Sequence, residues 1–203
     1  MSSNKNLRTA IRNSDAALLS RLREEAEDGP LSLEGESLSE IQSTDVDLFG
    51  IDLSNTEWEN CILDRVRFGD ANLEGAYFTG TTFLACTFVE THLEGTGFDG
   101  CVFRNCEIVG ANVTSTELSN NQFKGGRLAN VQLDDVEWRS SVFSDCRIEN
   151  IEGLSGTLSS VTLRNVEVEN FDTGGVTVEH CTVTPGAQVP KGFDAREGRR
   201  TKV

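Results

Sequence analysis

Apolar residues return at every fifth position over most of this chain. The series runs in steps of five from Leu33 to Val183, and only Ser43, Gly153 and Thr173 interrupt it. A period of five fits neither an α-helix, with 3.6 residues per turn, nor a β-strand, with a side-chain period of two. It therefore indicates a repeat architecture, in which each short unit buries one face against its neighbours.

The positions between these apolar centres are also patterned. Two residues before each centre the chain carries a small or β-branched residue, as at Thr56, Cys61 and Val66. Two residues after the centre, 25 of the 30 positions from Gly35 to His180 hold Gly, Asn, Asp or Ser. These residues turn a chain because they tolerate unusual φ or bond their own backbone. In each unit, two residues thus point inward, two point outward and one bends the chain.

Individual units carry a recognisable motif. Ala71-Asn72-Leu73-Glu74-Gly75 and Thr91-His92-Leu93-Glu94-Gly95 read small, Asp or Asn, Leu or Phe, polar, Gly, with His92 at the usual Asp or Asn place. Over roughly residues 31–185 the chain resembles the pentapeptide-repeat family. The resemblance implies an all-β fold, a right-handed quadrilateral parallel β-helix with four pentapeptides per coil and about seven to eight coils. At ~4.8 Å between coils, the rod would be roughly 37 Å long.

Coils of twenty residues would stack the inward aromatic residues in columns. One column would contain Phe83, Phe103, Phe123 and Phe143, and another would contain Trp58, Phe78, Phe98, Leu118 and Trp138. We interpret these aromatic residues as core and not as a ligand site, because all of them occupy inward centres. The six cysteines occupy the small inward position, where a thiol behaves as a compact hydrophobe. We therefore interpret the cysteines as core residues; the alternative is a disulfide between Cys86 and Cys106, which should stack one coil apart.

The repeat pattern explains the one apparent catalytic motif, and the chain contains no other. Gly95-Thr96-Gly97-Phe98-Asp99-Gly100 matches the dinucleotide fingerprint, but that fingerprint requires a strand before it and a helix after it. The chain has no nucleophile elbow, no H-E-x-x-H and no Walker loop. We therefore expect a protein that is not an enzyme, with no catalytic residues, metal or cofactor.

The two ends of the chain differ from the repeats. Apolar residues at helical spacing predict two short helices, about 5–12 and 15–27, with an N-cap within Asn13–Asp15 and a stop at Gly29-Pro30. Their expected role is to cover the first coil, because a bare strand edge would polymerise. We divide the chain into a helical cap (1–30), the repeat region (31–185) and a basic C-terminal tail (186–203). With no apolar leader and no segment able to cross a membrane, the sequence predicts a cytoplasmic protein.

Charge is distributed unevenly around the predicted rod. The formal net charge of the chain is −15. We name the four sides by their first units: first side (31–35), second side (36–40), third side (41–45) and fourth side (46–50), each recurring every twenty residues. The first side carries eight acidic residues and no Lys or Arg, and the second carries eight and Arg139. The third side is near neutral, and the fourth carries seven acidic residues and three arginines.

This clustering opposes stability, because Glu74 would stack on Glu94 and Glu117 on Glu137. We therefore predict that the first two sides bind a partner; the alternative is that their charge only keeps the rod solvated. The candidate residues are Asp52, Glu57, Glu59, Glu74, Glu94, Asp99, Glu117, Asp134, Asp135, Glu137, Glu152 and Asp172.

In length, N-terminal lead and acidity the chain resembles the quinolone-resistance members of the family, which mimic DNA and bind type II topoisomerases. That resemblance implies DNA gyrase or topoisomerase IV as the partner, no direct binding of nucleic acid, and leaves a homodimer open. The repeats lack the insertions from which some members project loops, so protection from quinolones is a weaker expectation than gyrase binding. The alternative is a scaffold that docks another protein through outward Ile62, Leu84, Val102 and Val142 on the third side.

Overall fold

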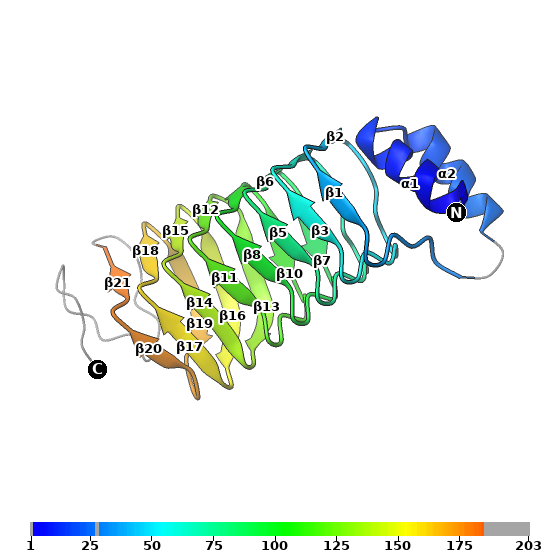
Figure 1. The fold of residues 1–203 in the computed structure, drawn as a ribbon. Helices are drawn as coiled ribbons and strands as arrows, with labels where there is room; N and C mark the ends of the chain where they lie inside the picture. The colour runs from blue at the N-terminus through cyan, green and yellow to red at the C-terminus, as the bar shows by residue number, and fades with distance from the viewer. Residues whose placement is uncertain (1, 27–28, 185–203) are drawn as a thin grey trace.

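The computed structural model describes residues 2–26 and 29–184, and it shows a rod of stacked coils with two helices at one end (Figure 1). All strand pairs are parallel, and paired residues differ by twenty in number, as in Leu38 with Trp58 and Trp58 with Phe78. The predicted right-handed quadrilateral β-helix is confirmed. The C-terminal segment 186–203, predicted as a basic tail, lies outside the described residues.

Three sides of the rod form continuous sheets, in which each strand pairs with the strand one coil away. The second side contains β1 (Ser37–Ser39), β3 (Glu57–Glu59), β5 (Tyr77–Thr79), β8 (Gly97–Asp99), β11 (Glu117–Ser119), β14 (Val136–Arg139), β17 (Gly156–Ser159) and β20 (Thr177–Glu179). The third side contains β2 (Gln42–Thr44), β4 (Ile62–Asp64), β6 (Thr82–Leu84), β9 (Val102–Arg104), β12 (Gln122–Lys124), β15 (Val142–Ser144), β18 (Thr162–Arg164) and β21 (Thr182–Val183).

The fourth side contains β7 (Thr87–Val89), β10 (Glu107–Val109), β13 (Arg127–Leu133), β16 (Arg147–Gly153) and β19 (Glu167–Asp172). The last three of these strands continue around a corner onto the first side. In the earlier coils the first side is joined by single bridges, such as Asp52 with Asn72 and Asn72 with His92.

The residues at the corners of the rod adopt the left-handed backbone conformation. Every residue whose number is a multiple of five from 35 to 180 has positive φ, except residues 155 and 175. Many are Asn, such as Asn55 (φ 55°) and Asn60 (φ 53°), and the remainder include glycines. The predicted turn positions are thus confirmed, and they convert a five-residue sequence period into a right-angled path.

Ala85 is an alanine at one of these corners, with φ 49°. The left-handed region costs an L-residue roughly 1–2 kcal/mol, and glycine avoids most of this cost. We expect Ala85→Gly to raise the free energy of unfolding by about 0.5–1 kcal/mol. Relief of the strained φ in the folded state should outweigh the extra conformational entropy that glycine gives the unfolded chain. Urea denaturation measures the change. The control, Ala71→Gly, removes a methyl group from a buried residue with ordinary φ and should destabilise; a gain in both variants would contradict the explanation.

Aromatic rings fill the interior in the predicted columns. Phe103 stacks on Phe83 and on Phe123 with ring centroids 4.6 and 4.4 Å apart, and Phe143 continues the column at 4.4 Å. In the second column, Trp58 stacks on Phe78 at 5.6 Å. All these residues are buried, so their interpretation as core is confirmed.

The small inward position has a hydrogen-bonding role that the sequence did not reveal. Thr91 and Thr96 donate their hydroxyls to the carbonyls of Phe68 and Leu73, which lie 23 residues earlier, in the coil below. Cys61 donates its thiol to the carbonyl of Leu38 in the same geometry. All six cysteines are buried and free, as their interpretation as core residues predicts.

Two helices cover the first coil, α1 (Ser2–Arg12) and α2 (Ala16–Glu25). Asp15 is the N-cap of α2, as predicted, and accepts from the backbone N–H of Leu18. Ser43, the one polar residue at a centre of the first coils, donates its hydroxyl to the carbonyl of Ile11 at 2.7 Å. It therefore bonds the cap in place of packing in the core.

The predicted helix ends are wrong by two or three residues. Helix α1 begins at Ser2 and not near residue 5, and α2 ends at Glu25 and not near residue 27. The last turn of α2 is held by Arg23, which donates to the backbone carbonyls of Asp47 and Phe49 on the fourth side. After this anchor the chain leaves the helix to reach Leu31 of the first coil. Neither helix is long and apolar enough to cross a membrane.

Candidate partner-binding surface

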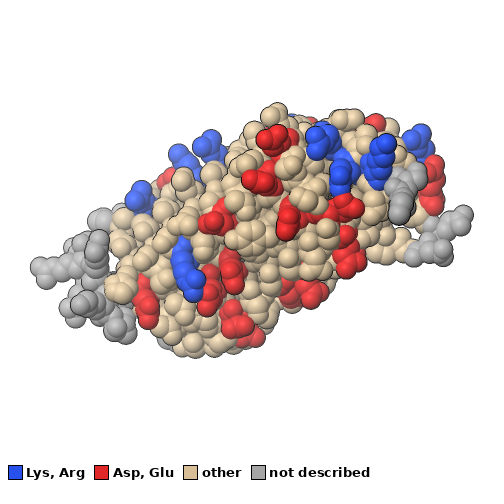
Figure 2. Space-filling view, viewed as in Figure 1, with Lys and Arg blue, Asp and Glu red and all other residues tan. Residues whose placement is uncertain are grey.

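The twelve predicted carboxylates lie on two adjacent sides of the rod, and we call them together the acidic surface. Figure 2 looks onto the second side, where acidic side chains gather, while basic side chains lie mainly along the upper edge and near the helices. Seven of the twelve side chains are exposed and five are half-buried. The half-buried ones are Asp52, Glu94, Asp99, Asp134 and Asp172.

On the second side the outward residues form two columns, one on each edge of the strands. In one column Glu117 and Glu137 are direct partners on β11 and β14, as predicted from the spacing. Their repulsion is partly relieved because Arg139 donates to Glu137 at 2.5 Å. The other column places Asp99 between Thr79 and Ser119. Glu57 and Glu59 project from the two edges of the same strand, β3.

Asp52 on the first side makes hydrogen bonds within the rod that stabilise the fold. Its carboxylate accepts hydrogen bonds from the hydroxyls of Ser32 and Ser54, from the Ser54 N–H and from the Asn72 amide, at 2.8–3.1 Å. Burial opposes ionisation of this carboxyl, but these hydrogen bonds outweigh it and lower the pKa of Asp52 below its usual value. Asp52 therefore ties three successive coils together, and its charge is partly satisfied within the rod.

Because the pKa of Asp52 is lower in the folded state, its stabilising contribution is complete above the unfolded value near 4 and is lost as the pH falls further. We expect Asp52→Asn to cost about 1 kcal/mol at pH 7, with the difference from wild type shrinking as the pH falls through the lowered pKa of the folded carboxyl. Urea denaturation at a series of pH values measures this. A difference that stays constant from pH 7 to pH 3 would show that the ionised carboxylate is not what stabilises the corner.

Other carboxylates of the first side also accept hydrogen bonds from neighbouring coils. The amide of Asn112 donates to Glu94 at 2.5 Å, and the hydroxyl of Ser155 donates to Asp134 at 2.6 Å. The other carboxylate oxygen of Glu94 is buried without a partner among the described residues. By contrast, Glu74 is exposed, and so are Glu57 and Glu117 on the second side. These exposed carboxylates are the ones most available to a partner.

The ion pairs with Lys or Arg lie mostly on the other two sides. On the third side Arg65 pairs with Asp45 at 2.6 Å. On the fourth side Arg67 pairs with Asp47 at 2.9 Å. Glu149, only 6 % exposed, is held on the fourth side between Arg127 and Arg147. Pairing with arginine thus neutralises some carboxylates of the third and fourth sides, such as Asp45, Asp47 and Glu149, whereas the acidic surface keeps most of its charge.

The apolar residues proposed as the alternative interface are separated by polar ones. Ile62 is 42 % exposed, but the next residues in its column are Thr82, Val102, Gln122 and Val142. Leu84 lies in the neighbouring column between Asp64 and Arg104. The sheet does not bring Ile62, Leu84, Val102 and Val142 into one continuous apolar patch.

Two outward features were missed by the sequence analysis. Tyr77 is 45 % exposed on β5 of the second side. Phe49 and Val89, 58 % and 40 % exposed, lie on the fourth side. The signal for all three was an apolar or aromatic residue directly beside a centre, where most repeats carry polar residues.

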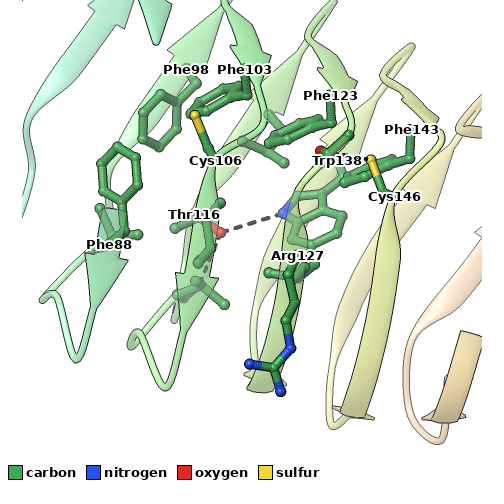
Figure 3. Close-up of a pocket in the computed structure, with 16 residues that line it drawn as sticks. Phe88, Phe98, Phe103, Cys106, Thr116, Phe123, Arg127, Trp138, Phe143 and Cys146 are labelled. Atoms are coloured by element: carbon green, nitrogen blue, oxygen red, sulfur yellow. Dashed lines mark hydrogen bonds between the residues drawn. The ribbon is translucent and has the colours of Figure 1, made fainter. Parts of the chain in front are cut away.

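An interior cavity of about 50 Å³ lies among the later aromatic residues (Figure 3). Phe98, Phe103, Phe123, Trp138 and Phe143 line it, and the Arg127 guanidinium points away from the rings. Leu118, which stands between Phe98 and Trp138 in their column, also lines the cavity. Its lining is mostly apolar, so we interpret it as a packing defect and not as a ligand site.

The described residues offer little for metal or nucleophilic chemistry. Across residues 2–26 and 29–184, no group of three or more His, Cys, Asp and Glu side chains could hold a metal ion. Burial raises the pKa of the Cys101 thiol to about 12 and that of Cys146 to about 11. Neither thiol is therefore ionised at neutral pH, as a metal ligand or a nucleophile would need to be.

Comparison with known families gives a decisive result for the repeats. A sequence model of the pentapeptide repeat region matches residues 76–153, and a model of eight pentapeptide repeats matches residues 44–80. The chain belongs to the pentapeptide-repeat family. No curated protein sequence matches this pentapeptide-repeat protein significantly.

Several solved structures resemble this pentapeptide-repeat protein at low identity. Full-length QnrB1, a plasmid-mediated fluoroquinolone resistance protein, is 17% identical, with 78% of this chain and 88% of that chain covered and a TM-score of 0.44. HetL, involved in heterocyst differentiation regulation in Nostoc sp. strain PCC 7120, is 16% identical, with 87% and 98% covered and a TM-score of 0.35. A pentapeptide repeat protein from the thylakoid lumen of Arabidopsis thaliana is 22% identical, with 56% and 68% covered and a TM-score of 0.22.

Proposed function

We propose that this pentapeptide-repeat protein is a non-enzymatic acidic rod that mimics B-DNA and binds a type II topoisomerase, DNA gyrase or topoisomerase IV. The rod would occupy the basic channel that otherwise holds a DNA segment, and so inhibit the enzyme or protect it from poisons. The proposal assigns the protein to the cytoplasm, with no cofactor and no direct contact with nucleic acid or membrane. It leaves a homodimer open.

The observation that supports the proposal is the segregation of charge. The first and second sides hold sixteen acidic residues of the repeats and, of Lys and Arg, only Arg139. B-DNA carries one charge per ~1.7 Å of axis, so ~37 Å of duplex has on the order of 22 charges. The rod has a similar length and a comparable net charge, and it should therefore be repelled by DNA and attracted to grooves that bind DNA.

The direct test is DNA supercoiling by purified gyrase, titrated with the full-length protein at several salt concentrations. We expect dose-dependent inhibition, or relief of quinolone poisoning, that weakens as salt rises because exposed charges are screened. A parallel titration with topoisomerase IV distinguishes the two enzymes. Absence of any effect at tens of micromolar on both enzymes would reject the proposed partner.

The second candidate function is a scaffold that recruits another protein through the third side. The observation in its favour is the exposure of Ile62 on that sheet. Neutralising the acidic surface should abolish a DNA-mimic function and spare docking through Ile62, Leu84, Val102 and Val142. Substituting these four residues by Ser or Thr should have the opposite effect.

A further inference from the structure

Tyr77 is the one tyrosine of the chain, and it lies within the acidic surface. It projects outward from β5, and its partners in the column are Glu57 on one side and Gly97 on the other. Glu117 follows Gly97 in the same column. An exposed aromatic ring is therefore surrounded along the rod by carboxylates.

The ring rests on Gly97. A Cβ atom at residue 97 would lie 2.3 Å from both Cδ2 and Cε2 of Tyr77, so any side chain there would displace the ring. Gly97 itself is buried, although it occupies an outward position of its strand. The residue does not have positive φ, so the backbone does not require glycine at this position. Glycine is instead explained by the ring that covers it.

The surroundings of this ring favour a cation. Burial raises the pKa of the Tyr77 phenol, and the negative charges of Asp99 and Glu117 raise it further, so the ring is neutral at physiological pH. The face of a neutral aromatic ring attracts a guanidinium, and nearby carboxylates can accept its N–H groups. Arginine suits such a site better than lysine, because its planar group stacks on a ring while it pairs with carboxylates.

We infer that Tyr77, held on Gly97, is the anchor on which an arginine of the basic partner protein stacks, with Glu57 and Glu117 placed to pair with it. The inference rests on the proposed function, because it takes the partner to be a basic, DNA-binding surface. The exposed carboxylates supply long-range attraction along the rod, whereas the ring defines one position at which a partner side chain must sit. Tyr77 is thus a specificity residue for the acidic surface.

The single tyrosine allows a direct test by NMR, with protein labelled with ¹³C in the tyrosine ring and titrated with deca-arginine or deca-lysine. We expect ring resonances to shift with deca-arginine, and deca-arginine to bind about fivefold more tightly than deca-lysine. Tyr77→Leu should weaken deca-arginine binding about tenfold without changing its salt dependence, since no charge is lost. Tyr77→Phe should bind as wild type.

A second variant guards against a simple folding defect in Tyr77→Leu. Gly97→Thr keeps the tyrosine but displaces its ring, and it should also weaken deca-arginine binding about tenfold. Wild-type binding by both Tyr77→Leu and Gly97→Thr, or unshifted ring resonances on saturation with deca-arginine, would overturn the inference. Because these assays contain no topoisomerase, ring stacking without any effect on gyrase would support the anchor and reject the proposed enzyme partner.

Discussion

Replacing Phe83 with alanine is expected to lower the free energy of unfolding by about 4 kcal/mol, a value typical of truncating a large buried aromatic residue to alanine. Phe83 is fully buried and stacks on Phe103 with ring centroids 4.6 Å apart. The edges of Phe78 and Phe88 pack against it at 5.4 and 5.5 Å. The cavity cannot collapse, because hydrogen bonds to the coils above and below fix the backbone around it.

Urea denaturation followed by circular dichroism measures this loss, and Phe49→Ala is the matched control. Phe49 is 58 % exposed, so the same truncation there should cost less than about 1 kcal/mol. Each coil contacts only its neighbours, so the Phe83→Ala variant can unfold in two stages. The fluorescence of the buried tryptophans, used as a second probe, would reveal such stages. Equal losses in the two variants would contradict the rigid aromatic column.

Neutralising four exposed carboxylates of the acidic surface is expected to raise the concentration needed for half-inhibition of gyrase about 30-fold. The variant combines Glu57→Gln, Glu59→Gln, Glu74→Gln and Glu117→Gln. At roughly 0.5 kcal/mol for each exposed charge, four changes amount to about 2 kcal/mol of binding free energy. The salt dependence of inhibition should weaken as well, because fewer charges meet the basic channel. Supercoiling assays at two salt concentrations measure both effects.

A variant with the same change in net charge on the fourth side is the control. It combines Asp70→Asn, Glu90→Gln, Glu107→Gln and Glu167→Gln, all exposed residues away from the acidic surface. We expect its half-inhibition to change less than about threefold, within the small effect of distant, screened charges. Equal losses in the two variants would mean that only net charge matters, and that the first and second sides are not the site.

Much of the fold could be predicted because this repeat links local and global structure closely. A residue at a multiple of five must turn, and a residue at a centre must point inward, so the positions of Phe83 and Phe103 followed from counting. The pairing of Glu117 with Glu137 followed in the same way. Helix ends were less predictable, because the end of α2 depends on where Arg23 meets the fourth side.

The sequence could assign a residue to a side of the rod, but not the direction in which its side chain bends. Asp52 and Asp134 were predicted to contact a partner on the same grounds as Glu74, yet both accept hydrogen bonds from adjacent coils. Tyr77 bends along the rod onto Gly97, a residue that the frame alone presents as an ordinary strand position. These side-chain directions depend on contacts between neighbouring coils, and the five-residue pattern does not predict them.

The register of twenty residues has a consequence for how this chain can change in length. Adding or deleting five residues preserves the inward pattern and the corners, so the fold survives, but every later residue moves to the adjacent side. Such a change would turn the downstream carboxylates by a quarter of the circumference and divide the acidic surface into two misaligned halves. Only changes of twenty residues keep both the core columns and the charged face in line. We therefore expect functional relatives to differ in length by whole coils, even though the fold itself would accept single repeats.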